Sequence, residues 1–269
     1  MLKKMVILLL IAGLLVAAPH AMLAAAFQLS PTAKTAMDKL AAGPDRALGG
    51  KITAAYNELL KLQEEAGRMD KDIGVLHLAN AEAETLVRKL IKELNADKRS
   101  KLEAQVKLTQ DKYEPLFLSY TALNKQIAAV RPLKSKSYNA MLRAQADIMQ
   151  TAVQIARADI KTKQAALKAL KDSNTQTAKK IRAILDEADP LRASIKAEKS
   201  ALSAPRKLTT EFGKSLNQAI KKNDANSVLS SLNSLVTVAR QISAQNRKIL
   251  ELEKKTSGII AKAKTQIPK

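Results

Sequence analysis

The dominant pattern in this chain is a set of apolar residues that recur at spacings of three and four. From Met149 to Leu202 the spacing alternates between four and three over sixteen positions, and twelve of these positions are apolar. A similar rhythm runs from Tyr113 to Val130. Such a repeat is the seam of a coiled coil, in which one stripe of each helix faces a partner helix. The predicted fold class is therefore all-α, an elongated antiparallel bundle or coiled coil of long helices.

Proline, glycine and short polar runs divide this pattern into helices. Ser30-Pro31 predicts the start of a short helix that ends near Ala42, and Gly49-Gly50 is expected to break the chain. The polar run from Asp172 to Thr177 is expected to be a weak point or a turn between two helices. We predict longer helices over 51–94, 98–131, 205–222 and 227–264, with an interruption or bend at Pro115 and with Asn226 capping the last helix. The segment whose seam runs from 149 to 202 is expected to form two helices of about 38 and 30 residues, with a further interruption at Pro190.

Composition supports helices and excludes several kinds of site. Aromatic residues make up 3% of the chain, and only eight glycines and eight prolines are present, which is unlike a sheet protein with frequent turns. The chain has no cysteine. A disulfide scaffold, a thiolate metal site, a cysteine nucleophile and a bacterial lipoprotein anchor are therefore excluded.

The N-terminus has the pattern of a secretory signal peptide over residues 1–26. Lys3 and Lys4 precede an apolar run from Met5 to Ala18, and three alanines at 24–26 provide a cleavage site before Phe27. An uncleaved membrane anchor is the alternative, because this segment is almost long enough to span a bilayer. No later segment has that length, so we expect a secreted protein, extracellular or associated with the cell wall, whose contact with the membrane is limited to this segment.

Charge divides the remaining chain into two sections. Residues 27–133 form an N-terminal helical section with 17 basic and 14 acidic side chains, a net charge of +3. Residues 134–269 form a basic C-terminal helical section with 27 basic and 11 acidic side chains, a net charge of +16. Such an excess indicates an anionic partner, although a solvated face that keeps the protein soluble remains the alternative. The candidate residues for binding an anionic polymer are Lys161, Lys168, Lys171, Lys179, Lys180, Arg182, Lys196, Lys199, Arg206 and Lys207.

The sequence offers no catalytic, cofactor-binding or metal-ligating set. His77 is the one histidine after the signal segment, and its neighbours do not resemble a ligand set. The segment 43–53 (GPDRALGGKIT) resembles a phosphate loop but lacks its first glycine and the Ser or Thr after the lysine. The aromatic group Tyr113, Phe117 and Tyr120 could stack sugars or bases, but its spacing favours core packing. We expect a protein that is not an enzyme and uses no cofactor.

These features predict a secreted, non-enzymatic cell-envelope protein that binds an anionic wall polymer through basic helix faces. Many weak, salt-screened contacts would act together along such a polymer. Two alternatives remain open. One is a structural coiled-coil spacer or self-associating filament subunit, which the regular seam would serve equally well. The other is an extracellular nucleic-acid binder, which the charge permits but no nucleic-acid-binding motif supports. A pore-forming protein is disfavoured, because no long apolar hairpin follows the signal segment.

Two stretches, LTQDKYEPLFLSYTALNKQI (108–127) and SLVTVARQI (234–242), carry a resemblance. They resemble uncharacterised secreted helical proteins of spore-forming Gram-positive bacteria, and the similarity extends over most of the chain after the signal segment. The resemblance implies an exported helical protein from a Gram-positive source. It implies no catalytic or binding residue.

Overall fold

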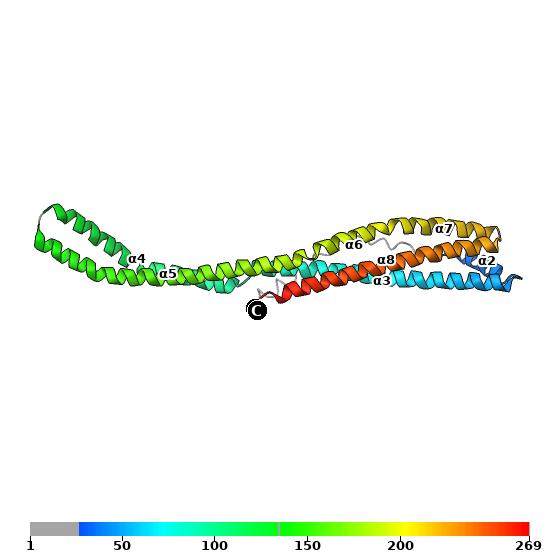
Figure 1. Cartoon of the computed structure of the whole chain (residues 1–269), viewed down its shortest axis with the longest axis horizontal. Helices are drawn as coiled ribbons and strands as arrows, with labels where there is room; N and C mark the ends of the chain where they lie inside the picture. Colours follow the sequence, from blue (N-terminus) through cyan, green and yellow to red (C-terminus); the bar gives the residue numbers. More distant parts are fainter. Residues whose placement is uncertain (1–26, 134, 269) are drawn as a thin grey trace, which may run out of the picture. The chain divides into compact units, whose positions relative to one another are not determined.

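The structure is a computed structural model that describes residues 27–133 and 135–268. The predicted signal peptide, residues 1–26, lies outside the described residues. The described residues form helices and no strands, which confirms the all-α prediction (Figure 1). The elements are α2 (Pro31–Ala41), α3 (Arg46–Lys92), α4 (Ala96–Val130), the 3-10 turn η1 (Arg131–Leu133), α5 (Lys136–Asp186), α6 (Asp189–Ala201), α7 (Ser203–Lys221) and α8 (Ala225–Thr265).

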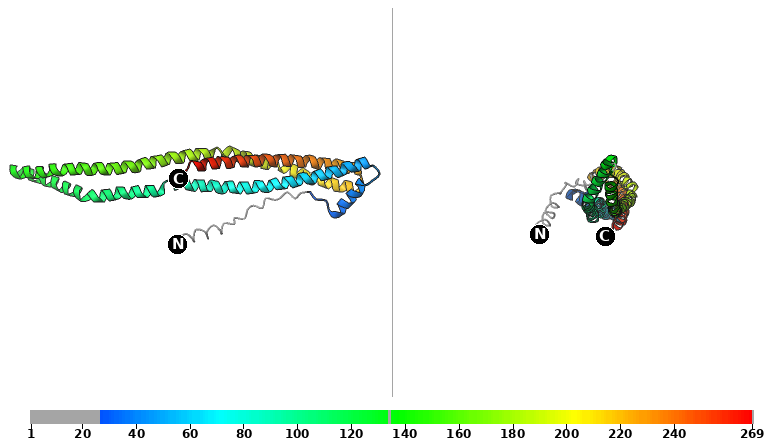
Figure 2. Two further views of the ribbon diagram at one scale, coloured as in Figure 1. Left: turned by 90° about the horizontal axis from the view of Figure 1, so that it is seen from below. Right: turned by 90° about the vertical axis from the view of Figure 1, so that its left-hand side faces the viewer.

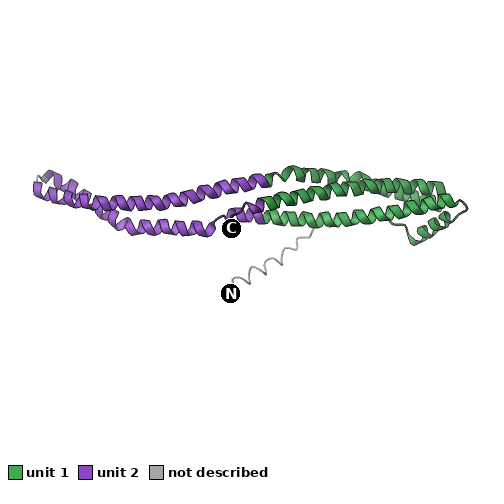
Figure 3. Cartoon of the chain, turned by 60° about the horizontal axis from the view of Figure 1, so that its bottom comes forward, with its two compact units in different colours: residues 1–85, 185–262 green, residues 86–184, 263–269 purple. Residues whose placement is uncertain are grey.

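Two compact units divide the chain (Figure 3). The described part of unit 1 comprises residues 27–85 and 185–262, and that of unit 2 comprises 86–133, 135–184 and 263–268. This division does not coincide with the predicted sections 27–133 and 134–269. Those sections follow charge along the sequence, whereas helices that pack side by side come from distant parts of the chain. The units are therefore assembled from both sections.

Unit 1 is a bundle in which α3 and α8 run parallel to each other. The consecutive helices α6 and α7 run beside them in the opposite direction (Figure 2). The parallel direction follows from the contacts, because Glu58, Glu65 and His77 of α3 meet Arg240, Arg247 and Glu253 of α8 in the same order. The short helix α2 packs against α7. α7 and α8 are antiparallel neighbours joined by the short turn at 222–224.

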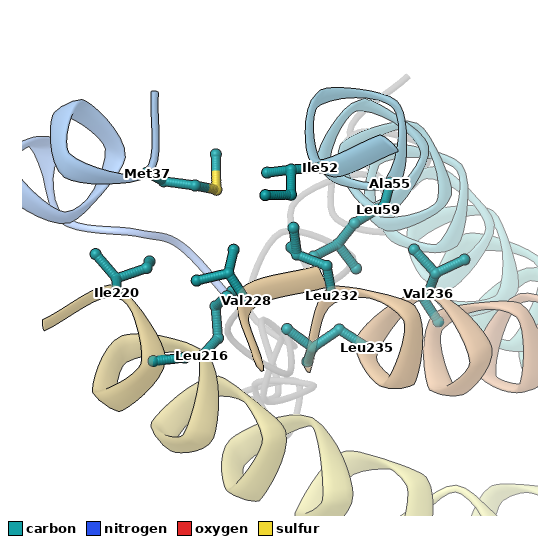
Figure 4. Close-up of a cluster of buried hydrophobic side chains, with 12 residues drawn as sticks. Met37, Ile52, Ala55, Leu59, Leu216, Ile220, Val228, Leu232, Leu235 and Val236 are labelled. Carbon is teal, nitrogen blue, oxygen red and sulfur yellow. The ribbon is translucent and has the colours of Figure 1, made fainter. Parts of the chain in front are cut away.

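The largest core of unit 1 lies where α2, α3, α7 and α8 meet (Figure 4). Ile52 and Leu59 of α3 face Leu232 and Leu235 of α8, and Leu216 of α7 closes the cluster; each of the five is at most 1% exposed. The buried residues of this cluster recur at three, four and seven residues along their helices, so each helix presents one apolar stripe. Removing such a buried Leu side chain typically costs about 2–5 kcal/mol.

Gly49 and Gly50 do not break the chain, contrary to the sequence prediction. Both lie within the first turns of α3, which begins at Arg46. A Cβ atom on Gly49 would lie 1.8 Å from the carbonyl oxygen of Ala41. Gly49 therefore allows the end of α2 to approach α3 closely, which is a requirement of packing and not of a turn.

Side-chain caps mark the starts of α2 and α8. Ser30 precedes α2, and its Oγ accepts a hydrogen bond of 3.2 Å from the Ala33 amide, as the Ser-Pro start predicts. The cap of α8 is Asp224, whose Oδ1 accepts from the Ser227 amide at 3.1 Å. The sequence prediction placed this cap two residues later, at Asn226. Asp224 takes the role because α8 already begins at Ala225.

Unit 2 is built on an antiparallel hairpin of α4 and the part of α5 up to residue 184. The two helices run alongside each other in Figures 1 and 2, and η1 joins them. Leu123 of α4 packs with Leu142 and Ala146 of α5 in the main apolar cluster of the hairpin. Pro115 lies inside α4 without ending it. The cluster of Leu123 contains only three buried residues among those described, fewer than the largest core of unit 1.

The predicted turn between Asp172 and Thr177 is absent, because α5 runs without interruption through this segment. Asn174 is instead a seam residue that bonds to the α3–α4 turn. Its Nδ2 donates to the carbonyl oxygen of Leu94 at 3.0 Å, and its Oδ1 accepts from Nδ2 of Asn95 at 2.6 Å. Asn95 has the left-handed φ of 50° that such a turn requires. Asn174 therefore supplies hydrogen bonds to the α3–α4 turn and does not form a turn of its own.

Candidate functional site

The basic excess of the chain is concentrated in unit 2. From residue 27 onward, the sequence segments of unit 1 carry 21 basic and 17 acidic side chains, a net charge of +4. Those of unit 2, residues 86–184 and 263–269, carry 23 basic and 8 acidic side chains, a net charge of +15. The charge asymmetry that the sequence shows therefore persists between the two units. Any surface that binds an anion by charge alone is most favoured on unit 2.

The ten predicted cations are distributed between the units. Those on α5 belong to unit 2, and those on α6 and α7 (Lys196, Lys199, Arg206 and Lys207) belong to unit 1. Two of the ten have a carboxylate partner: Lys171 Nζ lies 2.9 Å from Glu103 Oε1, and Arg206 Nη2 lies 3.9 Å from Asp70 Oδ1. The other eight form no ion pair within the described residues. The carboxylates of the protein thus leave most of the predicted cations without compensation.

Five cations of α5 share one side of the helix, which we call the cationic flank. Each of its eight positions directly follows a position of the α4-facing seam, so the flank keeps the same spacing of four and three. It contains no carboxylate, and all its residues except Ala178 are exposed. Lys179 and Lys180 fall outside it. The flank consists of Arg157, Lys161, Gln164, Lys168, Lys171, Thr175, Ala178 and Arg182.

Arg157 is a flank residue that the sequence prediction did not single out. The signal was present, because Arg157 follows the seam residue Ala156 just as Lys161 follows Ile160. The sequence prediction grouped the basic residues by their order along the chain. It did not assign them to helix faces, so it missed Arg157. Lys179 and Lys180 do not directly follow a seam position, so they lie outside the flank.

A shallow pocket of about 310 Å³ lies at the end of the flank that is nearer to η1. Arg157, Lys161 and Gln164 of α5 form one wall, and Phe117 and Tyr120 of α4 are among the residues of the other. A guanidinium and an ammonium group one helical turn apart can contact one phosphate together. The aromatic side chains beside them offer apolar contact to a sugar or polyol carbon chain.

The part of α4 beside this pocket carries acidic residues. Asp111 and Glu114 of α4 line a neighbouring pocket of about 380 Å³, together with Phe117 and Leu118. The hairpin face is therefore basic along α5 and acidic along this part of α4. An anionic chain would follow α5 and avoid α4, because like charges repel.

The aromatic group of α4 serves mainly in packing. The Tyr113 hydroxyl donates to Asp159 Oδ2 at 3.2 Å, and Tyr120 packs against the cluster of Leu123. All three rings are half-buried. This agrees with the favoured core interpretation for Tyr113, whereas Phe117 and Tyr120 also line the pocket.

Lys171 is the one flank cation with a carboxylate partner in the described structure. The hydrogen bond from Lys171 holds the pKa of Glu103 below its usual value, and the nearby positive charges of Lys171 and Arg99 act in the same direction. Lys171 therefore joins α4 to α5 in addition to lying on the flank. We expect it to contribute less to ligand binding than Arg157, Lys161 or Lys168.

Unit 1 contains a different polar site, built around a buried carboxylate. Glu253 of α8 is 1% exposed, and its Oε1 lies 2.7 Å from Nδ1 of His77. Asn80 Nδ2 donates to Glu253 Oε2 and to the Glu253 carbonyl oxygen, both at 2.9 Å. His77 was predicted to be an ordinary helical residue, and the structure gives it a partner that the sequence prediction missed. The only signal was that Glu253 continues the four–three spacing of the α8 seam.

The Glu253 site opens into a groove of about 440 Å³ between α3, α6 and α8. Arg192, Lys196 and Lys199 line its α6 side. Arg192 forms ion pairs with Glu84 and Asp189, so part of this charge is compensated. The described residues contain no group of three or more His, Asp or Glu side chains that could hold a metal ion. The polar side chains that line the groove link α3 to α8 and α6 to α3 through hydrogen bonds and an ion pair.

None of the helices in the described part of the chain has both the length and the apolar character needed to span a membrane. Comparisons with protein-family models, with curated proteins and with solved structures give no match to this chain.

Proposed function

We propose that this chain is an exported, non-enzymatic cell-envelope protein that binds an anionic wall polymer through the cationic flank of α5. The observation that carries the proposal is the absence of any carboxylate from the eight flank positions between residues 157 and 182. Five of these positions are cationic, and four of the five cations form no ion pair within the described residues. A merely solubilising helix face would normally intersperse acids among its bases.

The length and spacing of the flank suit an extended polymer better than a single small anion. Residues 157 to 182 span about 38 Å along the helix axis at 1.5 Å per residue. One exposed cation–phosphate contact is weak and screened by salt, but several contacts on one rigid helix act together. The pocket beside Arg157 and Lys161 adds an apolar wall for the carbon chain between phosphates. Polyol or sugar phosphates have this combination of groups.

Two sequence features support the location of the partner outside the cell. The first is the signal-peptide pattern of residues 1–26, which predicts export. The second is the resemblance to secreted helical proteins of Gram-positive bacteria, whose walls carry acidic polymers. Export also disfavours intracellular nucleic acid as the main partner.

Sedimentation with purified cell walls tests the proposal. The chain is mixed with intact walls and with walls stripped of acidic polymers, across a salt series. We expect binding to intact walls that falls steeply as salt rises, and little binding to stripped walls. Binding that survives stripping, or that does not depend on salt, overturns the proposal.

Matched charge-removing variants identify the binding surface. The triple variant Arg157→Gln, Lys161→Gln and Lys168→Gln should weaken wall binding on the order of tenfold or more, because it removes three contacts from one face. The control variant Lys196→Gln, Lys199→Gln and Lys207→Gln changes the net charge equally, but in unit 1. Equal losses in both would show that only net charge matters and would refute the flank as the site.

The same assay discriminates against the two alternatives. A structural spacer should bind neither intact nor stripped walls. A nucleic-acid binder should be retained more strongly on duplex DNA than on intact walls at the same salt concentration.

A further inference from the structure

α5 carries a second heptad seam on the side that faces away from α4. The α4-facing seam includes Leu142, Ala146, Met149, Val153 and Ala156, which are buried or half-buried. The second seam, which we call the outer seam, has the same alternation of three and four but is exposed at every position. It consists of Met141, Ala144, Ile148, Thr151, Ile155, Ala158, Thr162, Ala165 and Ala169.

The outer seam has two properties of an interface. None of its nine residues is charged, although 26% of the chain is charged. Its three large members, Met141, Ile148 and Ile155, follow one another at intervals of seven residues and are 49%, 76% and 62% exposed. Isolated exposed apolar residues are common on protein surfaces, but a regular heptad row of them indicates that another helix packs there.

The outer seam is complementary to itself when two copies pair antiparallel. In the register that places Ile148 of one copy opposite Thr151 of the other, Met141 faces Ala158 and Ile155 faces Ala144. Each large side chain then meets a small one, so the knobs of one helix enter the holes of the other. A parallel pair in register would place each large side chain opposite its own copy.

Charges at the borders of the seam agree with this register. Asp147 lies opposite Gln154, and Lys161 lies opposite Ala140. Asp159 of one copy lies opposite Tyr138 of the other, which is 47% exposed. No pair of like charges is opposed across the seam, and such a clash is what would normally exclude a self-pairing.

We propose that the outer seam is a homodimer interface, in which the α5 helices of two copies pair antiparallel about a two-fold axis between Met149 and Gln150. The isologous contact places the same surface patch on both copies. It covers the exposed row of Met141, Ile148 and Ile155. The cationic flank borders the seam without entering it, so the dimer would present two flanks to a polymer. Self-association does not depend on polymer binding, and either proposal can fail without the other.

Sedimentation equilibrium of the purified chain tests the dimer. We expect a mass of two chains, and the variant Ile148→Lys should weaken dimerisation on the order of 100-fold, because the two-fold symmetry places two lysines in one apolar seam. The far-ultraviolet circular dichroism should stay unchanged, since Ile148 is largely exposed in one chain. The control Gln150→Lys adds the same charge at an exposed position outside the seam and should remain dimeric. A monomeric wild-type chain, or a dimer that tolerates Ile148→Lys, overturns the proposal.

Cysteine cross-linking tests the register, and the absence of native cysteine removes any background. Ala144→Cys and Ile155→Cys should each cross-link poorly alone under diamide oxidation, because each faces the other position. A mixture of the two variants should give covalent dimers. Cross-linking of each variant with itself would indicate a parallel pair and would refute the proposed interface.

A membrane surface is the competing occupant of an exposed apolar row. Flotation with neutral phosphatidylcholine vesicles distinguishes it. We expect the chain to stay with the protein fraction. A monomer that floats with the vesicles, and that loses this property in Ile148→Lys, would replace the dimer proposal with a lipid-binding surface.

Discussion

The two units of this protein are both helical, but they differ in how their helices pack and in their net charge. Unit 1 packs several helices around shared cores, nearly balances its charge, and joins neighbouring helices by ion pairs such as Glu58–Arg240 and Glu65–Arg247. Unit 2 is largely a two-helix hairpin with a net charge of +15 and a single interhelical ion pair, Glu103–Lys171, among the interactions described within it. The comparison indicates that unit 1 is built for stability, whereas unit 2 exposes charge and an unpaired apolar seam at the expense of its own core.

The largest expected contrast is in core truncation. Leu232→Ala in unit 1 removes a side chain with 0% exposure from a cluster of twelve buried residues, and we expect a loss of about 3–4 kcal/mol in unfolding free energy. Leu123→Ala in unit 2 acts on a cluster of three buried residues, and we expect about 2 kcal/mol. Hydrogen exchange measured by mass spectrometry localises each loss to its unit. A greater cost for Leu123→Ala would contradict the contrast.

A smaller effect is expected from the polar network around the buried Glu253 of unit 1. His77→Ala removes the imidazole beside the buried Glu253 carboxylate, and we expect a loss of about 1–3 kcal/mol because the carboxylate loses a hydrogen-bond partner. Urea unfolding followed by circular dichroism measures it. Lys71→Ala, an exposed substitution on the same helix, is the control and should be close to neutral. Equal effects would show that the network does not stabilise unit 1.

The α8 cap gives a pH-dependent effect. Hydrogen bonds from the Ser227 hydroxyl and amide hold the pKa of Asp224 below its ordinary value of 3.8. A carboxyl group whose pKa is lowered in the folded state stabilises the protein above that ordinary value and loses this contribution as the pH falls below it. We expect Asp224→Ala to lower the melting temperature at pH 7 and the difference to shrink below about pH 3.8. A difference that stays constant with pH would contradict the cap.

The smallest effect is expected at the ion pair of unit 2. Lys171→Gln should raise the pKa of Glu103 towards its ordinary value, because the hydrogen bond from Lys171 is the main cause of its lowering. The melting temperature should hardly change, since an exposed ion pair contributes little to stability. Carboxyl chemical shifts in an NMR titration report the pKa. An unchanged titration of Glu103 would show that the pair does not form in solution.

Local sequence patterns were enough to predict the helical class, most helix boundaries and the charge asymmetry. These features depend on neighbours within a few residues: Ser30 caps α2, the polar turn at 222–224 separates α7 from α8, and Pro190 marks the start of α6. The four–three spacing likewise located the seam of α5 because side chains on one helix face follow from helix geometry alone. It was also enough to place Arg157 on the cationic flank, once positions are assigned to faces.

The role of several residues became clear only from the packing of distant helices. Gly49 serves a close approach to Ala41, Asn174 bonds to a turn 80 residues away in sequence, and Glu253 is buried against His77. Each of these three interpretations requires knowing which helix lies opposite. A helix has several faces that can pack, and the choice among partners depends on the combined burial of segments far apart in the chain. For the same reason, charge along the sequence did not reveal the two compact units.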